Sequence, residues 1–190
     1  MFRILLSVWA LTVVAGSLFL THYSNRPGKA AIAPEAWPSE SSLSLSTDRA
    51  TLLVLLHPQC SCSKATLAEL ERIMMAVGSS VDAQLVFFDS PNMDTGWVEG
   101  DLWERAAGIP GIQLVRDTDG ELIQQFGAFT SGQTLLYDPS GALLFKGGIT
   151  AARGHEGDNA GKKALISILK ERQNNLNETF VFGCSILGDT

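Results

Sequence analysis

The sequence predicts an α/β domain with a mixed β-sheet flanked by helices, preceded by an N-terminal transmembrane anchor. Two buried-strand patterns joined by a helical pattern, a later hairpin pattern, and an apolar run at the N-terminus lead to this expectation. The 190 residues, 45% hydrophobic and 18% charged, suit one packed domain with extensions. We expect four regions: an anchor or signal segment (1–24), a flexible linker (25–47), the domain (48–172) and a C-terminal tail (173–190).

The first region is an apolar run of 17 residues from Ile4 to Leu20. A bilayer core requires about 20 apolar residues, with about 17 as the lower limit. A small-x-small cleavage motif does not follow Leu20 directly, and Ala31-Ile32-Ala33 lies far from the run, so we favour an uncleaved anchor over a cleaved signal. Either reading places the remaining chain outside the cytoplasm, where disulfides persist.

Residues 25–47 contain three prolines and a serine-rich run, a composition typical of a tether. The net charge of −6 argues against a nucleic-acid partner. Three cysteines are too few for a disulfide scaffold, so cysteine chemistry should be local.

The domain begins with a continuous apolar run, residues 51–56, typical of a strand that is covered on both faces. A helical spacing of apolar residues follows from Leu67 to Val77 and ends at Gly78, and residues 84–88 form a second buried strand. These three elements predict a parallel β-α-β unit.

The second half predicts a short helix within 97–107, a short strand at 112–115 and a turn at 117–120. The run 134–137, the turn Asp138-Pro139-Ser140-Gly141 and the run 142–145 predict a β-hairpin. A glycine-rich loop then leads to a last helix, capped by Asp158 or Asn159.

Cys60 and Cys62 stand between the first strand and the first helix of the domain, after Pro58. A helix N-terminus lowers the pKa of a thiol, and the thiolate is the reactive form. The competing capping box Thr66-x-x-Glu69 would start the helix later and weaken this effect; we favour the earlier start, capped by Ser61 or Ser63.

The Cys-x-Cys spacing leaves three thiol arrangements open. A Cys60–Cys62 bond requires Cys60 to precede the helix, and so small a ring is strained and labile. Cys60 with Ser63 would form a single-thiol site, and Cys184 in the tail would act as a resolving thiol if it folds back. His57, three residues before Cys60, is a candidate for increasing the thiolate population.

The order of elements and the segment Cys60-Ser61-Cys62-Ser63-Lys64 resemble the thioredoxin superfamily, in particular its membrane-tethered TlpA/ResA-type proteins. His57 to Ser63, together with residues 131–134 and 147–150, is similar to the RedB-type branch. The resemblance covers about residues 48–172. In that family a cis-proline precedes the hairpin and lies against the redox sulfurs; Gly132 or Gln133 stands at its place here.

The resemblance implies a periplasmic, single-pass membrane protein that exchanges disulfides with protein thiols through Cys60 and Cys62. Pro58 and Gly132 or Gln133 would contact the substrate, and no cofactor or resident metal is expected. Two alternatives stay open. One is a copper-binding, Sco-like protein that uses the cysteines and His155, because thiolates select Cu(I). The other is a redox-inactive interaction module.

Overall fold

The computed structural model describes residues 1–91, 93, 95–171 and 176–188; the predicted 173–190 tail is therefore described only in part. Its centre is a five-stranded mixed sheet with the strand order β3-β2-β1-β4-β5. Strands β1, β2 and β3 run parallel, and β4 and β5 are antiparallel to their neighbours. This arrangement confirms the predicted mixed sheet.

The predicted β-α-β unit is present as β1 (Ala50–Leu56), α2 (Ser63–Val77) and β2 (Val81–Asp89). A short 3₁₀ turn, η1 (Gly78–Ser80), joins the helix to β2. β1 is the middle strand and is buried from Thr51 to Leu56, which explains its unbroken apolar sequence. The loop after its carboxyl end carries Cys60.

Where the sequence predicts one short helix within 97–107, the structure has two, α3 (Thr95–Val98) and α4 (Asp101–Ala107). Strand β3 (Ile112–Thr118) pairs with β2 along its whole length and is longer than the sequence predicted. The hairpin is formed by β4 (Gln133–Tyr137) and β5 (Leu143–Gly147).

The last helix, α6 (Ala160–Glu171), begins after Asn159. The Asn159 Oδ1 atom accepts a hydrogen bond of 2.7 Å from the Lys162 backbone N–H. Asn159, rather than Asp158, therefore caps this helix.

The expected turn at 117–120 leads directly into a helix that the sequence reading missed, α5 (Glu121–Gln125). The Asp117 carboxylate accepts 2.8 Å hydrogen bonds from the Leu122 and Ile123 backbone N–H groups. Asp117 thus satisfies two donors of a helix that is too short to show periodicity.

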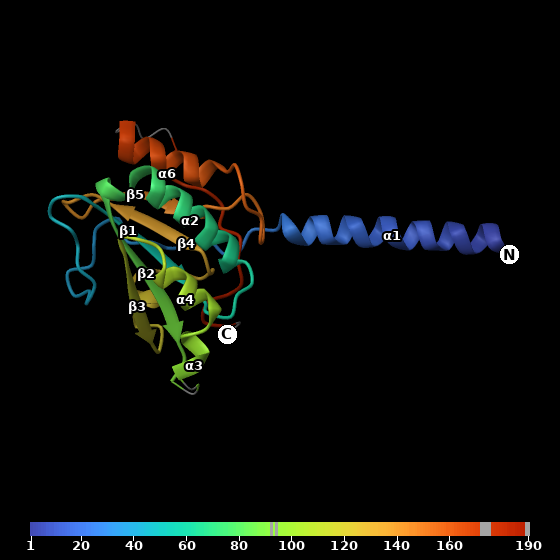
Figure 1. Cartoon of the computed structure of the whole chain (residues 1–190), viewed down its shortest axis with the longest axis horizontal. Coiled ribbons are helices and arrows are strands. Elements are labelled where there is room, and N and C mark those ends of the chain that lie inside the picture. Colours follow the sequence, from blue (N-terminus) through green and yellow to red (C-terminus); the bar gives the residue numbers. More distant parts are fainter. Residues whose placement is uncertain (92, 94, 172–175, 189–190) are drawn as a thin grey trace.

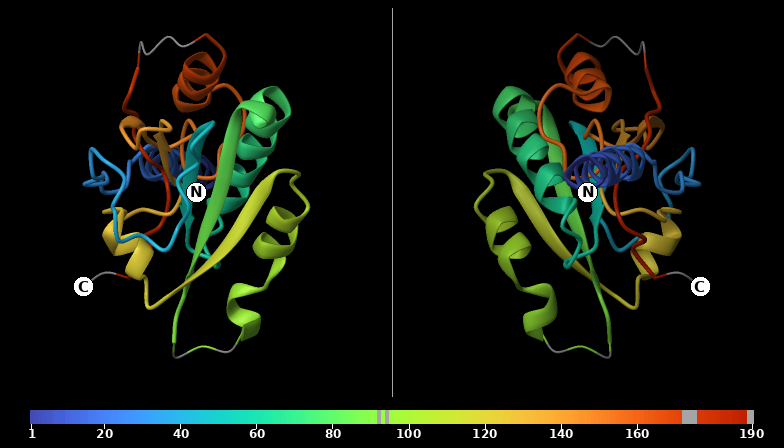
Figure 2. Two further views of the ribbon diagram at one scale, coloured as in Figure 1. Left: turned by 90° about the vertical axis from the view of Figure 1, so that its left-hand side faces the viewer. Right: turned by 90° about the vertical axis from the view of Figure 1, so that its right-hand side faces the viewer.

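Two apolar layers sandwich the sheet. One contains α2, α4 and α6, which pack on residues of β1 such as Leu52, Val54 and Leu56. The other contains α5, part of the 25–47 segment and the tail residue Ile186, packed on Leu53 and Leu55. Figure 2 shows α2 and α4 on one side of the twisted sheet, with α5 on the other.

The segment for which composition predicts a flexible linker contacts the domain repeatedly. Ile32 N–H donates to the Gly127 carbonyl (2.9 Å), and Trp37 N–H donates to the Gly141 carbonyl (2.7 Å). The Trp37 ring lies edge-on against Phe126, with ring centroids 5.0 Å apart. A few apolar residues placed between prolines are enough to hold this segment on the second layer.

The N-terminal helix α1 (Phe2–Ser24) projects away from the domain, with the chain terminus at its far end (Figure 1). None of its residues is buried, and an 18-residue window within it has a mean hydropathy of 2.1. Its 23 residues span about 34 Å, compared with about 30 Å for a bilayer core. Among the described residues, it is the one helix that is long and apolar enough to cross a membrane.

Candidate thiol site

The cysteine turn lies between β1 and α2, as the sequence predicts. Helix α2 begins at Ser63 with Cys62 as its N-cap residue, so Cys60 stands in front of the helix. The later start implied by Thr66 and Glu69 is wrong. The expected side-chain cap from Ser61 or Ser63 is also absent, since no side chain caps α2.

Three thiols converge at this turn. The sulfur atoms of Cys60, Cys62 and Cys184 all lie within 4.8 Å of one another, and the Sγ atoms of Cys60 and Cys184 are 2.9 Å apart. All three are free cysteines. Cys60 is 2% exposed and Cys62 is 9% exposed, whereas Cys184 is half-buried. The cluster therefore combines two neighbours in sequence with one residue from the far end of the chain.

Cys184 is held here by backbone pairing of the tail. Ser131 N–H donates to the Cys184 carbonyl (2.8 Å), and Ile186 N–H donates to the Phe129 carbonyl (3.0 Å). Thr130 and Ser185 form an antiparallel bridge between these bonds. The tail thus pairs antiparallel with residues 129–131, which lead into β4.

The three thiols have divergent proton affinities. The pKa of Cys60 is lowered to about 4, mainly because the Cys62 thiol donates a hydrogen bond to its sulfur. Hydrogen bonds from Cys184 and Ser63 lower this pKa further, whereas burial acts to raise it. The bond to Cys60 and burial raise the pKa of Cys62. Burial and the bond to Cys60 raise the pKa of Cys184 to about 11. These shifts favour the ionised form at Cys60 and the protonated form at Cys62 and Cys184.

Two serines support this thiolate. The Ser63 hydroxyl lies 2.8 Å from the Ser131 hydroxyl, and both side chains are buried. Ser131 Oγ also accepts a 2.8 Å bond from the His57 backbone N–H. Since Ser63 bonds to Cys60 in the sense that lowers its pKa, the chain of donors runs from His57 N–H through Ser131 and Ser63 to the sulfur.

His57 itself does not face the site as a cation. Its Nδ1 atom accepts a 3.1 Å bond from the Gln59 backbone N–H, and its ring lies edge-on to Trp97 with centroids 5.4 Å apart. Burial lowers the pKa of His57 below its usual value, although the Cys60 thiolate opposes this. The imidazole is therefore neutral at pH 7, and the residue contributes through its backbone.

A cavity of about 380 Å³ opens beside the cysteine turn. Its walls come from the turn and from the start of α4: Pro58, Gln59, Cys60, Ser61, Lys64, Gly100, Asp101 and Leu102. Of the residues expected to bind substrate, Pro58 lines this cavity. Gln133 is 1% exposed within β4, and Gly132 lies against the Thr66 side chain while its N–H donates to the Leu55 carbonyl (2.9 Å). The described chain has no cis peptide bond.

Arg153, which the sequence reading did not single out, connects this site to the anchor helix. Its side chain donates to the Gly183 carbonyl beside Cys184 and to the Arg26 carbonyl (3.2 Å). Its backbone N–H donates to the Ser24 carbonyl (3.0 Å), and its guanidinium lies 5.2 Å from the centre of the Tyr23 ring. No local motif marks such a residue, because its partners are far away in sequence.

The loop that carries Arg153 is fixed by a buried charge, Glu69 of α2, which is 0% exposed. Glu69 accepts 2.6 Å bonds from the Gly157 backbone N–H and the Lys162 ammonium, and it pairs with Arg72. Burial acts to raise the pKa of Glu69, but these partners outweigh it and lower the pKa. Glu69 is thus a buried carboxylate with a structural role, in the helix that follows the cysteine turn.

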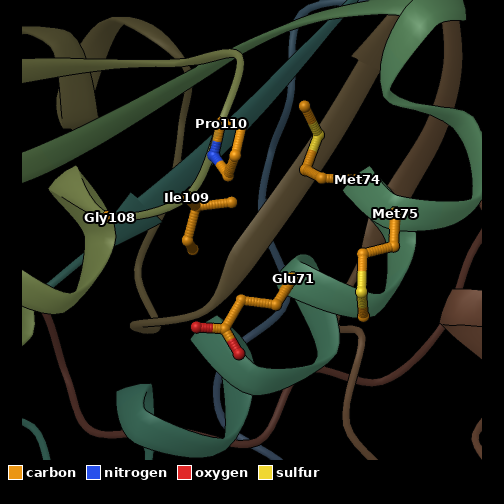
Figure 3. Close-up of a pocket in the computed structure, with 6 residues that line it drawn as sticks. All are labelled: Glu71, Met74, Met75, Gly108, Ile109 and Pro110. Carbon is orange, nitrogen blue, oxygen red and sulfur yellow. The ribbon is translucent and has the colours of Figure 1, made fainter.

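His155, the other ligand considered for copper, is exposed in this loop and is not part of the sulfur cluster. Figure 3 shows a separate cavity of about 310 Å³ between α2 and the segment that precedes β3. Its lining residues are Glu71, Met74, Met75, Gly108, Ile109 and Pro110. It lies at the other end of α2 from the cysteines and contains no thiol.

Comparison with known proteins gives structural matches alone: no family model and no curated protein matches the sequence. An uncharacterized conserved protein from Geobacillus kaustophilus superposes with a TM-score of 0.62 at 16% identity, covering 87% of this chain and 93% of that chain. The hypothetical protein SMc02350 from Sinorhizobium meliloti 1021 superposes at 0.59 with 18% identity, covering 85% and 94%.

A putative thiol:disulfide interchange protein DsbE from Chlorobium tepidum is also similar, with a TM-score of 0.46, 18% identity and coverage of 75% of this chain and 94% of that chain. The strand order, the parallel β1-α2-β2 unit and the hairpin followed by α6 define the fold. It is thioredoxin-like. This agrees with the fold of the resemblance noted in the sequence, while the narrower branch stays a prediction.

Proposed function

We propose that this protein is an extracytoplasmic thiol–disulfide oxidoreductase, held at a membrane by α1, that exchanges disulfides with protein partners through Cys60. The observation that carries the proposal is the position of Cys60 in front of α2, with its sulfur 2.9 Å from Cys184 Sγ and within 4.8 Å of Cys62 Sγ. A thiolate is the attacking species in disulfide exchange, and a second thiol at hydrogen-bond distance completes the exchange.

The chemistry assigns distinct roles to the thiols. Cys60 attacks, because its pKa of about 4 leaves it ionised at any physiological pH. Cys62 and Cys184 keep their protons, so each donates a hydrogen bond to Cys60 and each is a candidate to release the bound substrate. The lowered pKa of Cys60 argues against the redox-inactive alternative, because a buried structural thiol keeps its proton.

The test is exchange with a disulfide-linked peptide, followed by thiol counting on the full chain in detergent across graded glutathione buffers. We expect two thiols to appear and disappear together at one potential, and Cys60→Ser to abolish exchange. Ser61→Ala is the matched control, because Ser61 is exposed on the same turn. Full exchange activity of the Cys60→Ser variant would refute the mechanism.

Copper binding is the second candidate, and the convergence of three sulfurs within 4.8 Å favours it. Thiolates select Cu(I), so the cluster fits such an ion chemically. Gel filtration after incubation with Cu(I) separates the two functions. Retention of one copper per chain, lost in Cys184→Ser, would favour metal delivery, whereas a metal-free protein with cycling thiols would favour exchange.

A further inference from the structure

The nucleophile of the proposed exchange reaction is covered. Cys60 is 2% exposed, so the disulfide of a folded partner cannot reach its sulfur in this conformation. Besides the Cys62 thiol of the same turn, a sulfur of the tail contacts it, since Cys184 Sγ lies 2.9 Å away. The tail therefore occupies a position from which the sulfur of a partner could contact Cys60.

The tail is bound through its backbone, in antiparallel pairing with residues 129–131, just before β4 begins. Its backbone pairs with residues 129–131 through the Ser131–Cys184 and Ile186–Phe129 bonds, and Thr130 faces Ser185 across the bridge. Backbone pairing of this kind binds extended peptides with little dependence on their side chains. Residues 129–131 can hold another extended chain only when the tail leaves them.

We propose that residues 183–186 form a built-in substrate strand: Cys184 closes a disulfide with Cys60 in the oxidised protein, and a partner reaches Cys60 by replacing this strand. The inference rests on the proposed exchange function and names its second thiol, its regulation and its substrate class. Cys62 then acts as the permanent donor to the Cys60 sulfur and takes no part in the main disulfide.

Geometry favours Cys184 over Cys62 as the disulfide partner. A Cys60–Cys62 disulfide would close a ring across a single intervening residue, at the start of a helix, where the geometry of a relaxed disulfide is hard to reach. Cys184 approaches from a separate segment, so its side chain meets Cys60 without deforming the turn.

In the reducing direction the steps are as follows. The Cys60 thiolate attacks one sulfur of a partner disulfide, a Cys60–partner bond forms, and the other partner sulfur leaves as a thiolate. Cys184 then loses its proton to that thiolate and attacks Cys60 Sγ, the mixed disulfide breaks, and the second partner sulfur leaves as a thiolate that takes a proton from solvent. The partner gains two electrons, and Cys60 and Cys184 lose two; the reverse steps oxidise a dithiol partner.

The tail also specifies the substrate. A Cβ atom on Gly183 would lie 1.9 Å from the Ser131 carbonyl oxygen, so this position accepts only glycine without a shift of backbone. Arg153 donates to the Gly183 carbonyl, which orients the residue before the cysteine. The site therefore fits an extended peptide whose cysteine follows a glycine.

The tail is held, but not on every side. Ile186 is fully buried in the layer that contains α5, which anchors the strand. Just before the strand, residues 176 and 178–182 border an apolar cavity of about 740 Å³, while the backbone of residues 177–181 pairs with Lys146 and Gly28. Release of residues 183–186 alone breaks the pairing with residues 129–131 and the contacts of Ile186, which costs fewer contacts than the loss of a core element.

The decisive experiment traps the mixed disulfide. The full chain in detergent is reduced and mixed with a peptide carrying a Gly-Cys disulfide, and the Cys60–peptide adduct is followed by mass spectrometry in Cys62→Ser and Cys184→Ser. We expect the adduct to persist at least ~10-fold longer in Cys184→Ser than in Cys62→Ser, because only the former lacks the intramolecular attacking thiol. Persistence in Cys62→Ser with rapid resolution in Cys184→Ser would overturn the inference and leave the proposed function standing. Absence of any Cys60 adduct in both variants would overturn both.

A second measurement tests the strand itself. Gly183→Ala displaces the tail, so we expect Cys60 to be alkylated at least ~10-fold faster than in the wild type, because the pairing with Ser131 no longer excludes the reagent. Ser185→Ala is the matched control, since Ser185 is exposed on the same strand. We also expect Gly-Cys peptides to react faster than Val-Cys peptides. Equal alkylation rates in Gly183→Ala and Ser185→Ala, or equal rates for the two peptides, would refute the substrate-strand assignment.

Discussion

The hydroxyl of Ser63 provides the sharpest test of how the site makes its thiolate. Ser63 bonds to Cys60 and lies 2.8 Å from Ser131, whose hydroxyl receives the His57 backbone N–H. Ser63→Ala removes the last donor of this chain and changes no charge. It also leaves Cys62 and Cys184 in place as donors.

The magnitude follows from the strength of one hydrogen bond to a charged group. Such a bond contributes about 1.5 kcal/mol, and about 1.4 kcal/mol corresponds to one pH unit. We therefore expect Ser63→Ala to raise the pKa of Cys60 from about 4 to about 5. At a pH of about 4.5 the thiolate fraction would fall from about three-quarters to about one-quarter, while at neutral pH both proteins would remain ionised.

The assay is the ultraviolet absorbance of the thiolate as a function of pH, which does not require a reagent to reach the buried sulfur. The raised pKa values of Cys62 and Cys184 keep them out of the acid range, so no further substitution is needed. Ser61→Ala, on the same turn, should titrate like the wild type. A Cys60 midpoint in Ser63→Ala that stays within about 0.3 pH units of the wild type would refute the donor chain, given that one lost bond is worth about one unit.

Two further substitutions and one deletion test other parts of the molecule. Glu69→Gln should lower the free energy of unfolding by about 3 kcal/mol near pH 7, because it leaves the Lys162 ammonium beside a neutral group. Since the folded pKa of Glu69 is lowered, this deficit in urea unfolding should be complete above the usual value of 4.5 and shrink as pH falls below it; a deficit that is constant with pH would contradict the ion pair. Gly132→Ala should lower the free energy of unfolding by about 2 kcal/mol more than the control Gly154→Ala does, measured by thermal unfolding. Both positions have a positive φ (+92° and +66°), but only at Gly132 does the added Cβ meet another atom, Thr66 Oγ1 at 2.9 Å. Removal of residues 2–24 should move the protein from the alkaline-resistant membrane fraction to the soluble fraction, and equal partitioning of the two forms would argue against an anchor.

Much of the fold could be read from local pattern. Continuous apolar runs predicted β1 and β2 because buried parallel strands need no alternation, and the turn at 138–141 predicted the hairpin. Helix α5 was not predicted, because five residues are too few to show a helical period. The contacts of the 25–47 segment also escaped, since proline-rich composition describes stiffness and says nothing about what the intervening apolar residues meet.

The site, like the fold, could be predicted from the sequence only in part. The placement of Cys60 before α2 followed from the strand-to-helix boundary, which the sequence marks with Pro58. The approach of Cys184 was only one of three open arrangements, because a contact across 124 positions depends on where the tail pairs. Ser131 and Arg153 could not be selected as site residues at all. Their roles depend on tertiary neighbours, and neither residue type is distinctive.

Arg153 touches both ends of the chain at once: the last turn of α1 through Ser24 and Tyr23, and the strand that carries Cys184 through Gly183. One side chain therefore spans the distance between the anchor and the thiols. If α1 spans a bilayer, the reactive sulfur would lie close to the lipid headgroups and would not move freely at the end of a flexible linker. The sulfur could then react only with cysteines that partner proteins expose at the same short distance from the membrane surface.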